Sequence, residues 1–502
     1  MGADATVWIL TALSALAQVI NFSYRVVMAR LVGAEVMGLY QLVMSAYAVI
    51  QAITTVGLTS AMSNLTAHYL AVGDKAGARS LRVTCFGLFC CLMVPVGGIT
   101  ILCSDAISVY LLGDARTRLG LILLIPCLTL TAVENLHKNA FYGAGQPVPP
   151  AAAEVWEQLV RAGAVLGLLY LFLPQYPERA VGLVMWGMIL CEVSSAVTLC
   201  TLYRHCFGEV PAGVGQDSPH RRRSRICAIA FPVAANALLG NLLGAANSAL
   251  VPRQLVRSGM ERSLAVSKLG VVCGMTMPML ALPTVYLGAL NLILMPKLAR
   301  ATALNRKGEV QGLISEGMER VCALTVPCMT AMIVFGEDLG RLLYAREDVG
   351  EYLLPLAVTM GIGCLVSVLA TALNSIGRQK AVAMISLTGG AVQVACTFFF
   401  TALPGVEMGG FVAGALAAAV LEVGLCLAAV VRATDLHLRV GKWLFNPALA
   451  SLLAGLNARL LLRILTEANF PAHCAPITAL VFAAAQYTLV MRLLRKKIDE
   501  SA

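Results

Sequence analysis

The chain has 502 residues, of which 59% are hydrophobic and 13% are charged, and its mean hydropathy is +0.80. A water-soluble protein of this length needs far more polar surface to cover its core, so the composition excludes that class. The formal net charge of +10 does not indicate nucleic-acid binding, because the densest basic cluster, HRRRSR at 220–225, lies between apolar segments without interleaved aromatic residues.

Apolar segments recur along the whole chain and predict its fold class. Each is about 20 residues or longer, which is enough to cross a hydrocarbon core of about 30 Å. The bilayer forces every spanning segment to close its backbone hydrogen bonds internally, so we predict an all-α polytopic membrane protein. Fourteen transmembrane helices are expected, at residues 6–31, 38–66, 80–103, 118–141, 151–173, 180–203, 226–251, 264–296, 318–335, 352–376, 381–402, 408–431, 443–464 and 474–494.

The charges of the loops predict the orientation in the membrane. An even number of spans places both termini on one side, and the loops of that side hold most of the loop Lys and Arg residues, including RLLRKK at 492–497. The positive-inside rule therefore places both termini in the cytoplasm, and HRRRSR is interpreted as a topological signal.

The chain carries no recognisable catalytic or metal-binding motif. Its 16 cysteines include no C-x-x-C pair and lie mostly inside apolar runs, so we interpret them as small buried hydrophobic residues. The six histidines are scattered, and no Ser–His–Asp set shares a loop. We therefore expect a protein that is not an enzyme and holds no resident metal or other cofactor.

The chain resembles itself at an offset of 232 residues, which places Arg25 on Arg257 (257 − 25) and Gly38 on Gly270 (270 − 38). The match continues without a gap over six spans, so the two copies share one orientation and are expected to be related by an axis along the membrane normal. A substrate path between two such lobes is typical of transporters. The predicted organisation is an N-lobe of helices 1–6 (1–210), a basic cytoplasmic linker (211–225), a C-lobe of helices 7–12 (226–435), and helices 13 and 14 with a cytoplasmic tail (436–502).

The predicted fifth span, at 151–173, carries the most informative charges. Glu154, Glu157 and Arg161 follow one another at spacings of three and four, so they share one helix face. Arg161 then lies about 15 Å deep, where its side chain cannot easily reach water. Two interpretations stay open: Glu157 and Arg161 neutralise each other within the helix, or their face lines a hydrated cavity.

Further ionisable residues lie within other spans. Glu192 and Glu422 lie near mid-depth at almost equivalent positions of the two copies. Each is interpreted either as an ion-coupling site, for Na⁺ or H⁺, or as a helix-packing hydrogen bond. Near the inner end of the fourth span, Lys138 can extend to water, whereas Glu134 is deeper.

Basic residues gather toward the predicted outer side. Arg253, Arg257 and Arg262 form either an interfacial rim or a vestibule that attracts anions. Lys268 lies a few residues into the eighth span. Arg25 lies about 28 Å along the first helix, so it either reaches the outer water or faces a cavity.

Three stretches carry a resemblance to a known family. FSYRVVMARLVGAEVMGLYQLV (22–43), TTVGLTSAMSNLTAHYLAVGDKAGA (54–78) and YGAGQPVPPAAAEVWEQLVR (142–161) resemble the polysaccharide-transporter branch of the MATE-like flippase (MOP) superfamily. The strongest motifs are A-R-x-x-G-A at 29–34, G-L-Y-Q at 38–41 and E-Q-x-x-R at 157–161. Within the branch, the chain is most similar to the stage V sporulation protein B group and, more distantly, to the lipid II flippases.

The resemblance implies a function and a location. It implies a protein of the bacterial cytoplasmic membrane that moves an undecaprenyl-pyrophosphate-linked saccharide, such as a peptidoglycan precursor, from the inner to the outer leaflet by alternating access. We expect a monomer in the lipid bilayer, with no nucleic-acid partner. The alternative is a cation-coupled multidrug antiporter of the same superfamily, a group that usually has twelve spans and acidic sites for cationic drugs.

The resemblance also implies cations that meet the pyrophosphate in the cavity. The lipid II flippases carry arginine where this chain has Tyr24 and Gln18, so their cationic set is not matched at these two positions. We therefore place the substrate cavity at other charged residues, with a secondary set nearby. The cavity residues are Arg25, Glu157, Arg161, Arg257 and Lys268, and the secondary candidates are Glu134, Lys138, Glu154 and Arg253.

Overall fold

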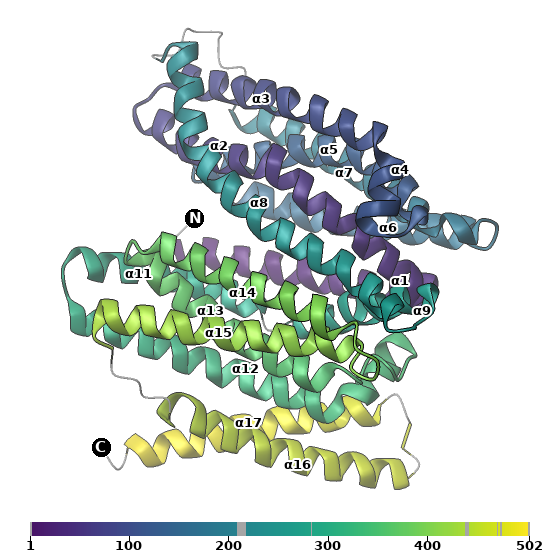
Figure 1. Ribbon diagram of the computed structural model, residues 1–502. Helices are drawn as coiled ribbons and strands as arrows, with labels where there is room; N and C mark the ends of the chain where they lie inside the picture. Colours follow the sequence, from purple (N-terminus) through teal and green to yellow (C-terminus); the bar gives the residue numbers. More distant parts are fainter. Residues whose placement is uncertain are drawn as a thin grey trace. The chain divides into compact units, whose positions relative to one another are not determined.

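Every regular element in the computed structural model is helical over the residues that it describes, which are 3–207, 217–282, 284–436, 441–468, 470–471 and 474–499. The chain forms two compact units, shown in Figure 1. The first unit comprises residues 1–256 and 260–270. Its elements are α1 (Ala3–Gln51), the π-helical turn η1 (Ala52–Val56), α2 (Gly57–Ala71), α3 (Lys75–Leu102), α4 (Ser104–Ala106), η2 (Ile107–Leu112), η3 (Ala115–Thr117), α5 (Arg118–Gly143), α6 (Val148–Phe172), η4 (Pro177–Arg179), α7 (Ala180–Phe207), α8 (Pro219–Arg257) and α9 (Arg262–Leu269).

The second unit comprises residues 257–259 and 271–502. Its apolar core is built by α11, α12, α13 and α15, while α16 and α17 pack on α12 around the fully buried Phe335. The elements that lead into this unit and form it are η5 (Gly270–Thr276), α10 (Met277–Leu280), α11 (Thr284–Ala303), α12 (Lys307–Tyr344), α13 (Leu353–Ser375), α14 (Gln379–Phe400), α15 (Met408–Thr434), η6 (Gly441–Phe445), α16 (Asn446–Glu467) and α17 (Ala475–Asp499).

Thirteen segments of the described chain are long and apolar enough to cross a membrane. The first of them, Ile9–Ala71, has 63 residues and a helical length of about 95 Å, which is enough for two crossings. Gly33 interrupts it with φ 77° and ψ 173°, a conformation that glycine adopts without strain, and Figure 1 shows α1 turning back before it leads into α2. Counted as two spans, this segment brings the total to the fourteen expected, so the predicted all-α polytopic class is confirmed.

Two predicted boundaries were wrong. The eighth span, expected as one helix over 264–296, is broken between α10, which ends at Leu280, and α11, which begins at Thr284. The backbone N–H groups of Ala281 and Leu282 close a turn onto the carbonyls of Met277 and Met279 there. The basic cluster HRRRSR does not lie in a linker loop, because α8 already begins at Pro219. Residues 208–216, the first part of the predicted linker, lie outside the described residues.

The start of α8 is tied to the first unit by a buried carboxylate. Asp217 accepts hydrogen bonds from the Tyr69 hydroxyl at 2.8 Å and from the Arg225 guanidinium at 2.7 Å. Arg222, only 8% exposed, donates to the Asp217 backbone oxygen at 3.0 Å. These contacts anchor Arg222 and Arg225, while the other residues of the basic stretch are exposed. Positive charge at the inner membrane face is their expected topological role.

Contact between α1 and α9 bears on the predicted repeat. A Cβ added at Gly38 would overlap the backbone oxygen of Val266, and one added at Gly270 would overlap that of Ala34. The offset of 232 relates Gly38 to Gly270 and also Ala34 to Val266 (266 − 34). The contact is therefore reciprocal between the two copies, which favours the repeat. The units divide near residue 256 rather than at the predicted linker, so α8 packs with the first unit; the assignment of two six-helix lobes stays a prediction.

Candidate functional site

Three neighbouring helices of the first unit, α5, α6 and α7, position the candidate site. Both α5 and α6 pack along α7. The approach of α6 to α7 is close because position 187 lacks a side chain: a Cβ on Gly187 would lie 2.7 Å from the Cα of Val165. Arg161 lies one turn before Val165, and Glu192 lies five residues after Gly187, so this close packing brings two charged side chains of different helices together.

Five charged side chains meet between these helices, and we call them the charge cluster: Glu134 and Lys138 from α5, Glu157 and Arg161 from α6, and Glu192 from α7. The Lys138 ammonium pairs with Glu134 and, at 2.9 Å, with Glu157. The Arg161 guanidinium pairs with Glu157 and, at 3.3 Å, with Glu192. The two cations thus alternate with the three carboxylates in one continuous network.

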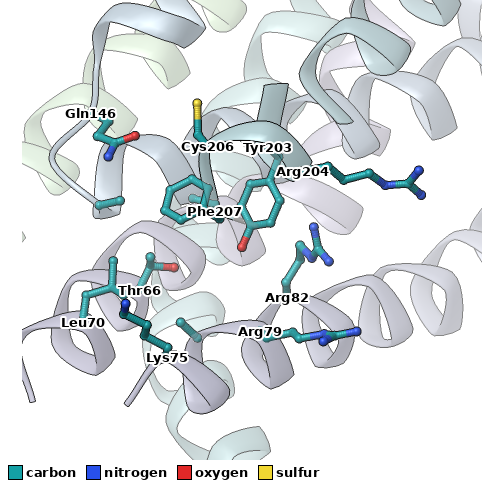
Figure 2. A pocket seen from close by; sticks show the side chains of 13 residues that line it. Thr66, Leu70, Lys75, Arg79, Arg82, Gln146, Tyr203, Arg204, Cys206 and Phe207 are labelled. Atoms are coloured by element: carbon teal, nitrogen blue, oxygen red, sulfur yellow. The ribbon is translucent and has the colours of Figure 1, made fainter. Parts of the chain in front are cut away.

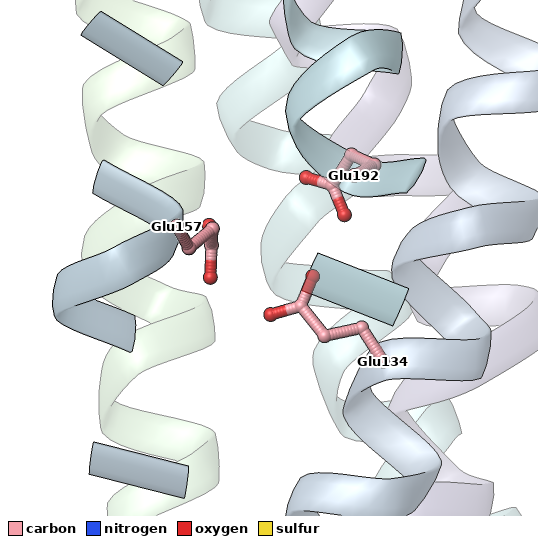
Figure 3. A group of neighbouring side chains, drawn as sticks. All are labelled: Glu134, Glu157 and Glu192. Carbon is pink, nitrogen blue, oxygen red and sulfur yellow. The ribbon is translucent and has the colours of Figure 1, made fainter. Parts of the chain in front are cut away.

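The three carboxylates of the cluster converge on one point, as Figure 3 shows. One oxygen from each of Glu134, Glu157 and Glu192 lies within 4.8 Å of the others. All three residues are buried, at 2%, 6% and 3% exposure. One oxygen of Glu134 (Oε2) and one of Glu192 (Oε2) have no hydrogen-bond partner in the described part of the chain. Buried polar atoms are nearly always paired in native proteins, so these two oxygens mark a place for a donor.

Tyrosines of α1 surround the cluster. Tyr24 and Tyr40 are buried, and they lie close enough to Arg161 to interact with it electrostatically. The Tyr47 hydroxyl donates to the Thr131 hydroxyl at 3.2 Å, one turn before Glu134 on α5. Sequence reasoning assigned no site role to these tyrosines. The one indication in the sequence was that Tyr24 stands where related flippases carry arginine. Helical periodicity does not relate Tyr24 to Tyr40, because the kink at Gly33 lies between them.

The structure brings together five residues that were predicted from three separate spans. The helix-internal pair of Glu157 and Arg161 is present, yet it is part of a larger network and does not close on itself. Arg161 is thus paired with two carboxylates, and the assignment of Glu157 and Arg161 to a substrate cavity stays a prediction. Glu154, on the same helix, is half-buried and lies outside the five-residue network.

The other predicted residues lie elsewhere in the two units. Arg25 on α1 is half-buried and makes no hydrogen bond or ion pair with the described residues. Arg253 donates to the backbone oxygen of Tyr110. Lys268 on α9 is half-buried, and Arg257 is exposed. Their assignment to a substrate cavity stays a prediction.

Glu422, which the predicted repeat places nearly on Glu192, lies in the second unit. Its carboxylate is half-buried on α15 and packs against α14 at Gly389, whose missing side chain leaves room for it. In the described chain, the carboxylates of Glu134, Glu157 and Glu192 form a convergent group, and Glu422 is not part of it. Its predicted role in ion coupling is untested.

The sixteen cysteines are all free thiols. Six of them are buried, including Cys127 on α5 and Cys191 on α7. The Cys191 thiol donates to the backbone oxygen of Glu157 at 3.3 Å, so it packs directly behind the charge cluster. The interpretation of the cysteines as small buried residues therefore holds for these six and is wrong for the six that are exposed, among them Cys90 and Cys91.

Known proteins resemble the chain in sequence and in structure. Residues 5–301 match the family described as "Polysaccharide biosynthesis protein". Stage V sporulation protein B of Bacillus subtilis (strain 168) is 23% identical over 443 residues, which cover 87% of this chain and 85% of that protein.

Two solved structures show the fold. An inward closed conformation of the lipid II flippase MurJ matches with a TM-score of 0.73 and 10% identity, over 97% of this chain and 99% of that one. An inward-facing multidrug resistance MATE family transporter of the MOP superfamily matches with a TM-score of 0.67 and 14% identity, over 85% of this chain and 96% of that one. At such low identities these likenesses establish a common fold and no more.

Proposed function

The chain belongs to the polysaccharide biosynthesis protein family and has the multi-span fold of the MOP superfamily, and on this basis we propose that it is a flippase for a lipid-linked saccharide. The substrate is an undecaprenyl-pyrophosphate-linked saccharide, such as a peptidoglycan precursor, which moves from the inner to the outer leaflet. Transport proceeds by alternating access, and both termini lie in the cytoplasm of a bacterial cell. No chemical step on the substrate is part of the proposal.

Coverage supports a flippase over the alternative, a multidrug antiporter. The lipid II flippase structure matches 97% of this chain, whereas the multidrug transporter structure matches 85%. The part of this chain that the multidrug transporter structure does not match is close in length to the region after residue 435, which holds α16 and α17. The relative in sequence is a sporulation protein, and the family is named for polysaccharide biosynthesis.

The observation that carries a transport function is the charge cluster. Ionisable groups inside membrane-spanning helices are costly, and they persist where they are paired and have a task, such as relaying protons. With all five groups ionised, three carboxylates and two cations leave one net negative charge. Binding one proton or one monovalent cation makes the cluster neutral.

A proton fits this cluster better than Na⁺. A metal ion needs several free oxygen ligands, but Lys138 and Arg161 already take the positions between the carboxylates. The oxygens without a partner belong to Glu134 and Glu192, and a single proton held between them gives both a hydrogen bond. We infer that this proton couples transport to the pH gradient, because its binding changes the net charge that α5, α6 and α7 must bury.

The cluster does not bind the pyrophosphate itself, because it is net negative. The headgroup is received by cations outside the network, and Arg25, Lys268 and Arg257 are the candidates. The half-buried Arg25, which has no ion-pair partner in the described residues, is the first of them to test.

The test is a transfer assay with the full chain reconstituted in vesicles. Fluorescently labelled undecaprenyl-pyrophosphate saccharide is supplied in one leaflet, and its arrival in the other is followed by quenching. The wild-type chain is expected to accelerate transfer, and Glu192→Gln, which leaves the amide in place of the proton-binding carboxylate, is expected to abolish it at equal protein content. Lys307→Met, at an exposed ion pair, is the matched control and keeps wild-type transfer.

Two outcomes would contradict the proposal. Ethidium extrusion without transfer of the labelled lipid would replace the flippase by the multidrug antiporter. Wild-type transfer by Glu192→Gln would remove the charge cluster from the mechanism, while the flippase function itself would stand.

A further inference from the structure

A second polar site lies in the first unit, at the end where α2 and α7 finish and α3 begins. A cavity of about 640 Å³ opens there, and it is separate from the charge cluster. Its lining includes Lys75, Arg79 and Arg82 from α3 and Arg204 from α7. Figure 2 shows these side chains around one space, which we call the basic pocket.

The basic pocket gathers positive charge without a carboxylate among its described lining residues. Like charges on neighbouring helices, here Lys75 and Arg82 on α3 and Arg204 on α7, repel one another, and an anion between them would offset this repulsion. The Arg82 guanidinium lies 4.3 Å from the centre of the Tyr203 ring, and this stacking holds it in place on the pocket wall. The positive-inside rule accounts for the sign of these charges, but it does not require that basic residues of two helices line one cavity.

A buried hydroxyl gives the second, independent indication of a ligand. Thr66 on α2 lines the basic pocket and is only 4% exposed, and its Oγ1 has no hydrogen-bond partner among the described residues. Figure 2 shows the Thr66 and Tyr203 hydroxyls near the same space as the cations. A ligand with several acceptor oxygens would satisfy the hydroxyl donor and the guanidinium donors together.

We propose that the basic pocket binds a phosphate-bearing anion. Guanidinium groups bind phosphate through two parallel hydrogen bonds, and hydroxyl donors commonly complete such sites. The volume admits a phosphodiester or pyrophosphate group, and the aromatic rings of Tyr203 and Phe207 offer an apolar wall beside it. Basic pockets between helices at a membrane face bind the headgroups of anionic lipids, while the same chemistry would hold a soluble phosphate from the cytoplasm.

The inference does not depend on the proposed transport substrate, because no residue of the charge cluster lines the basic pocket. Its test uses the full chain in phosphatidylcholine nanodiscs with two probes. One arm titrates inorganic pyrophosphate; the other replaces part of the phosphatidylcholine by phosphatidylglycerol. Both arms record the midpoint of thermal unfolding, and the first also gives an affinity by calorimetry.

The pocket variant is Lys75→Gln/Arg204→Gln, because both side chains are exposed and their replacement is expected to leave the fold intact. Arg378→Gln/Lys380→Gln removes the same charge from exposed positions of the second unit and serves as the control. The pocket variant is expected to bind about tenfold more weakly or worse, since each charge-assisted hydrogen bond contributes roughly 1.5 kcal/mol or more. Thr66→Val, nearly isosteric, is expected to weaken binding at unchanged net charge.

Each outcome decides the proposal. Stabilisation by pyrophosphate alone identifies a soluble phosphate ligand, and stabilisation by phosphatidylglycerol alone identifies a lipid headgroup; both support the phosphate site. No stabilisation in either arm, or an equal loss in the control variant and the pocket variant, would overturn it.

Discussion

Lys138→Met tests the charge cluster as a structural unit. The Lys138 ammonium is 13% exposed and pairs with Glu134 and, at 2.9 Å, with Glu157. Methionine keeps the length and the apolar stem of the side chain, so packing is largely preserved. The substitution removes one of two cations and leaves the cluster with two net negative charges instead of one.

The expected loss follows from this geometry. One pair at 2.9 Å is worth about 6 kcal/mol of Coulomb energy at an effective dielectric constant of 20. Part of this is offset, because the ammonium no longer has to be desolvated. Removing one partner of a buried ion pair typically costs about 3–5 kcal/mol, since the other charge stays buried without compensation. We expect a loss of unfolding free energy in that range.

The free cysteines supply the assay. Buried thiols such as Cys85, Cys127 and Cys322 become reactive only when the chain unfolds. Once the exposed thiols have been alkylated, a thiol-reactive fluorophore can therefore follow thermal unfolding in detergent. Lys307→Met is the matched control: Lys307 pairs with Asp435 also at 2.9 Å, but the two side chains are 73% and 71% exposed. An exposed pair contributes about 1 kcal/mol or less, so the control should unfold almost as the wild type does.

A second substitution separates charge from packing. Lys138→Met/Glu134→Gln removes one carboxylate as well and returns the cluster to one net negative charge, so it is expected to recover much of the lost stability. If Lys138→Met unfolds no earlier than Lys307→Met, the five groups do not form an energetically coupled network, and the reasoning fails.

Two further predictions concern other parts of the first unit. Gly270→Ala is expected to lower the free energy of unfolding by about 1–3 kcal/mol, because the new Cβ overlaps the backbone oxygen of Ala34. Gly98→Ala is the control, since a Cβ at Gly98 meets no atom within 4 Å. Equal unfolding midpoints for the two variants would refute the close contact of α1 and α9. At Asp114, burial acts to raise the pKa, but the hydrogen bonds donated by Arg116 outweigh it and hold the pKa below its usual range. The folded state thus favours the carboxylate, and its contribution is present above the unfolded pKa of about 3.9 and is lost as pH falls through the lower folded value. Asp114→Asn should therefore destabilise the chain at pH 7 and lose its effect in acid, and a constant difference across this range of pH would contradict the assignment.

Part of the candidate site could be read from the sequence. The spacing of Glu157 and Arg161 places both on one helix face whatever surrounds the helix, and the structure confirms their pair. Their partners Lys138 and Glu192 could not be found in this way. The helices that carry them are apolar on nearly all sides, so no amphipathic pattern indicates which face of α5 or α7 turns toward α6.

The basic pocket shows the same limit. Lys75 and Arg204 lie far apart in the sequence, and each alone is typical of a helix end at the inner membrane face. Only the packing of α3 beside α5 and of α5 beside α7 brings them to one cavity with the hydroxyl of Thr66. The position of a charged residue in the sequence therefore predicts how deep it lies in the membrane and how the chain is oriented, but not which residues it contacts in the folded protein.

The membrane class, the all-α fold and the approximate positions of most spans could be predicted from the sequence alone. These features follow from hydrocarbon thickness, helical rise and local composition, which act within one segment. Only the folded chain shows where α1 turns back, that HRRRSR is helical, and which charges of α5, α6 and α7 neutralise one another. Those depend on the rotation and approach of packed helices, set by small residues such as Gly187 and by contacts between segments remote in the chain.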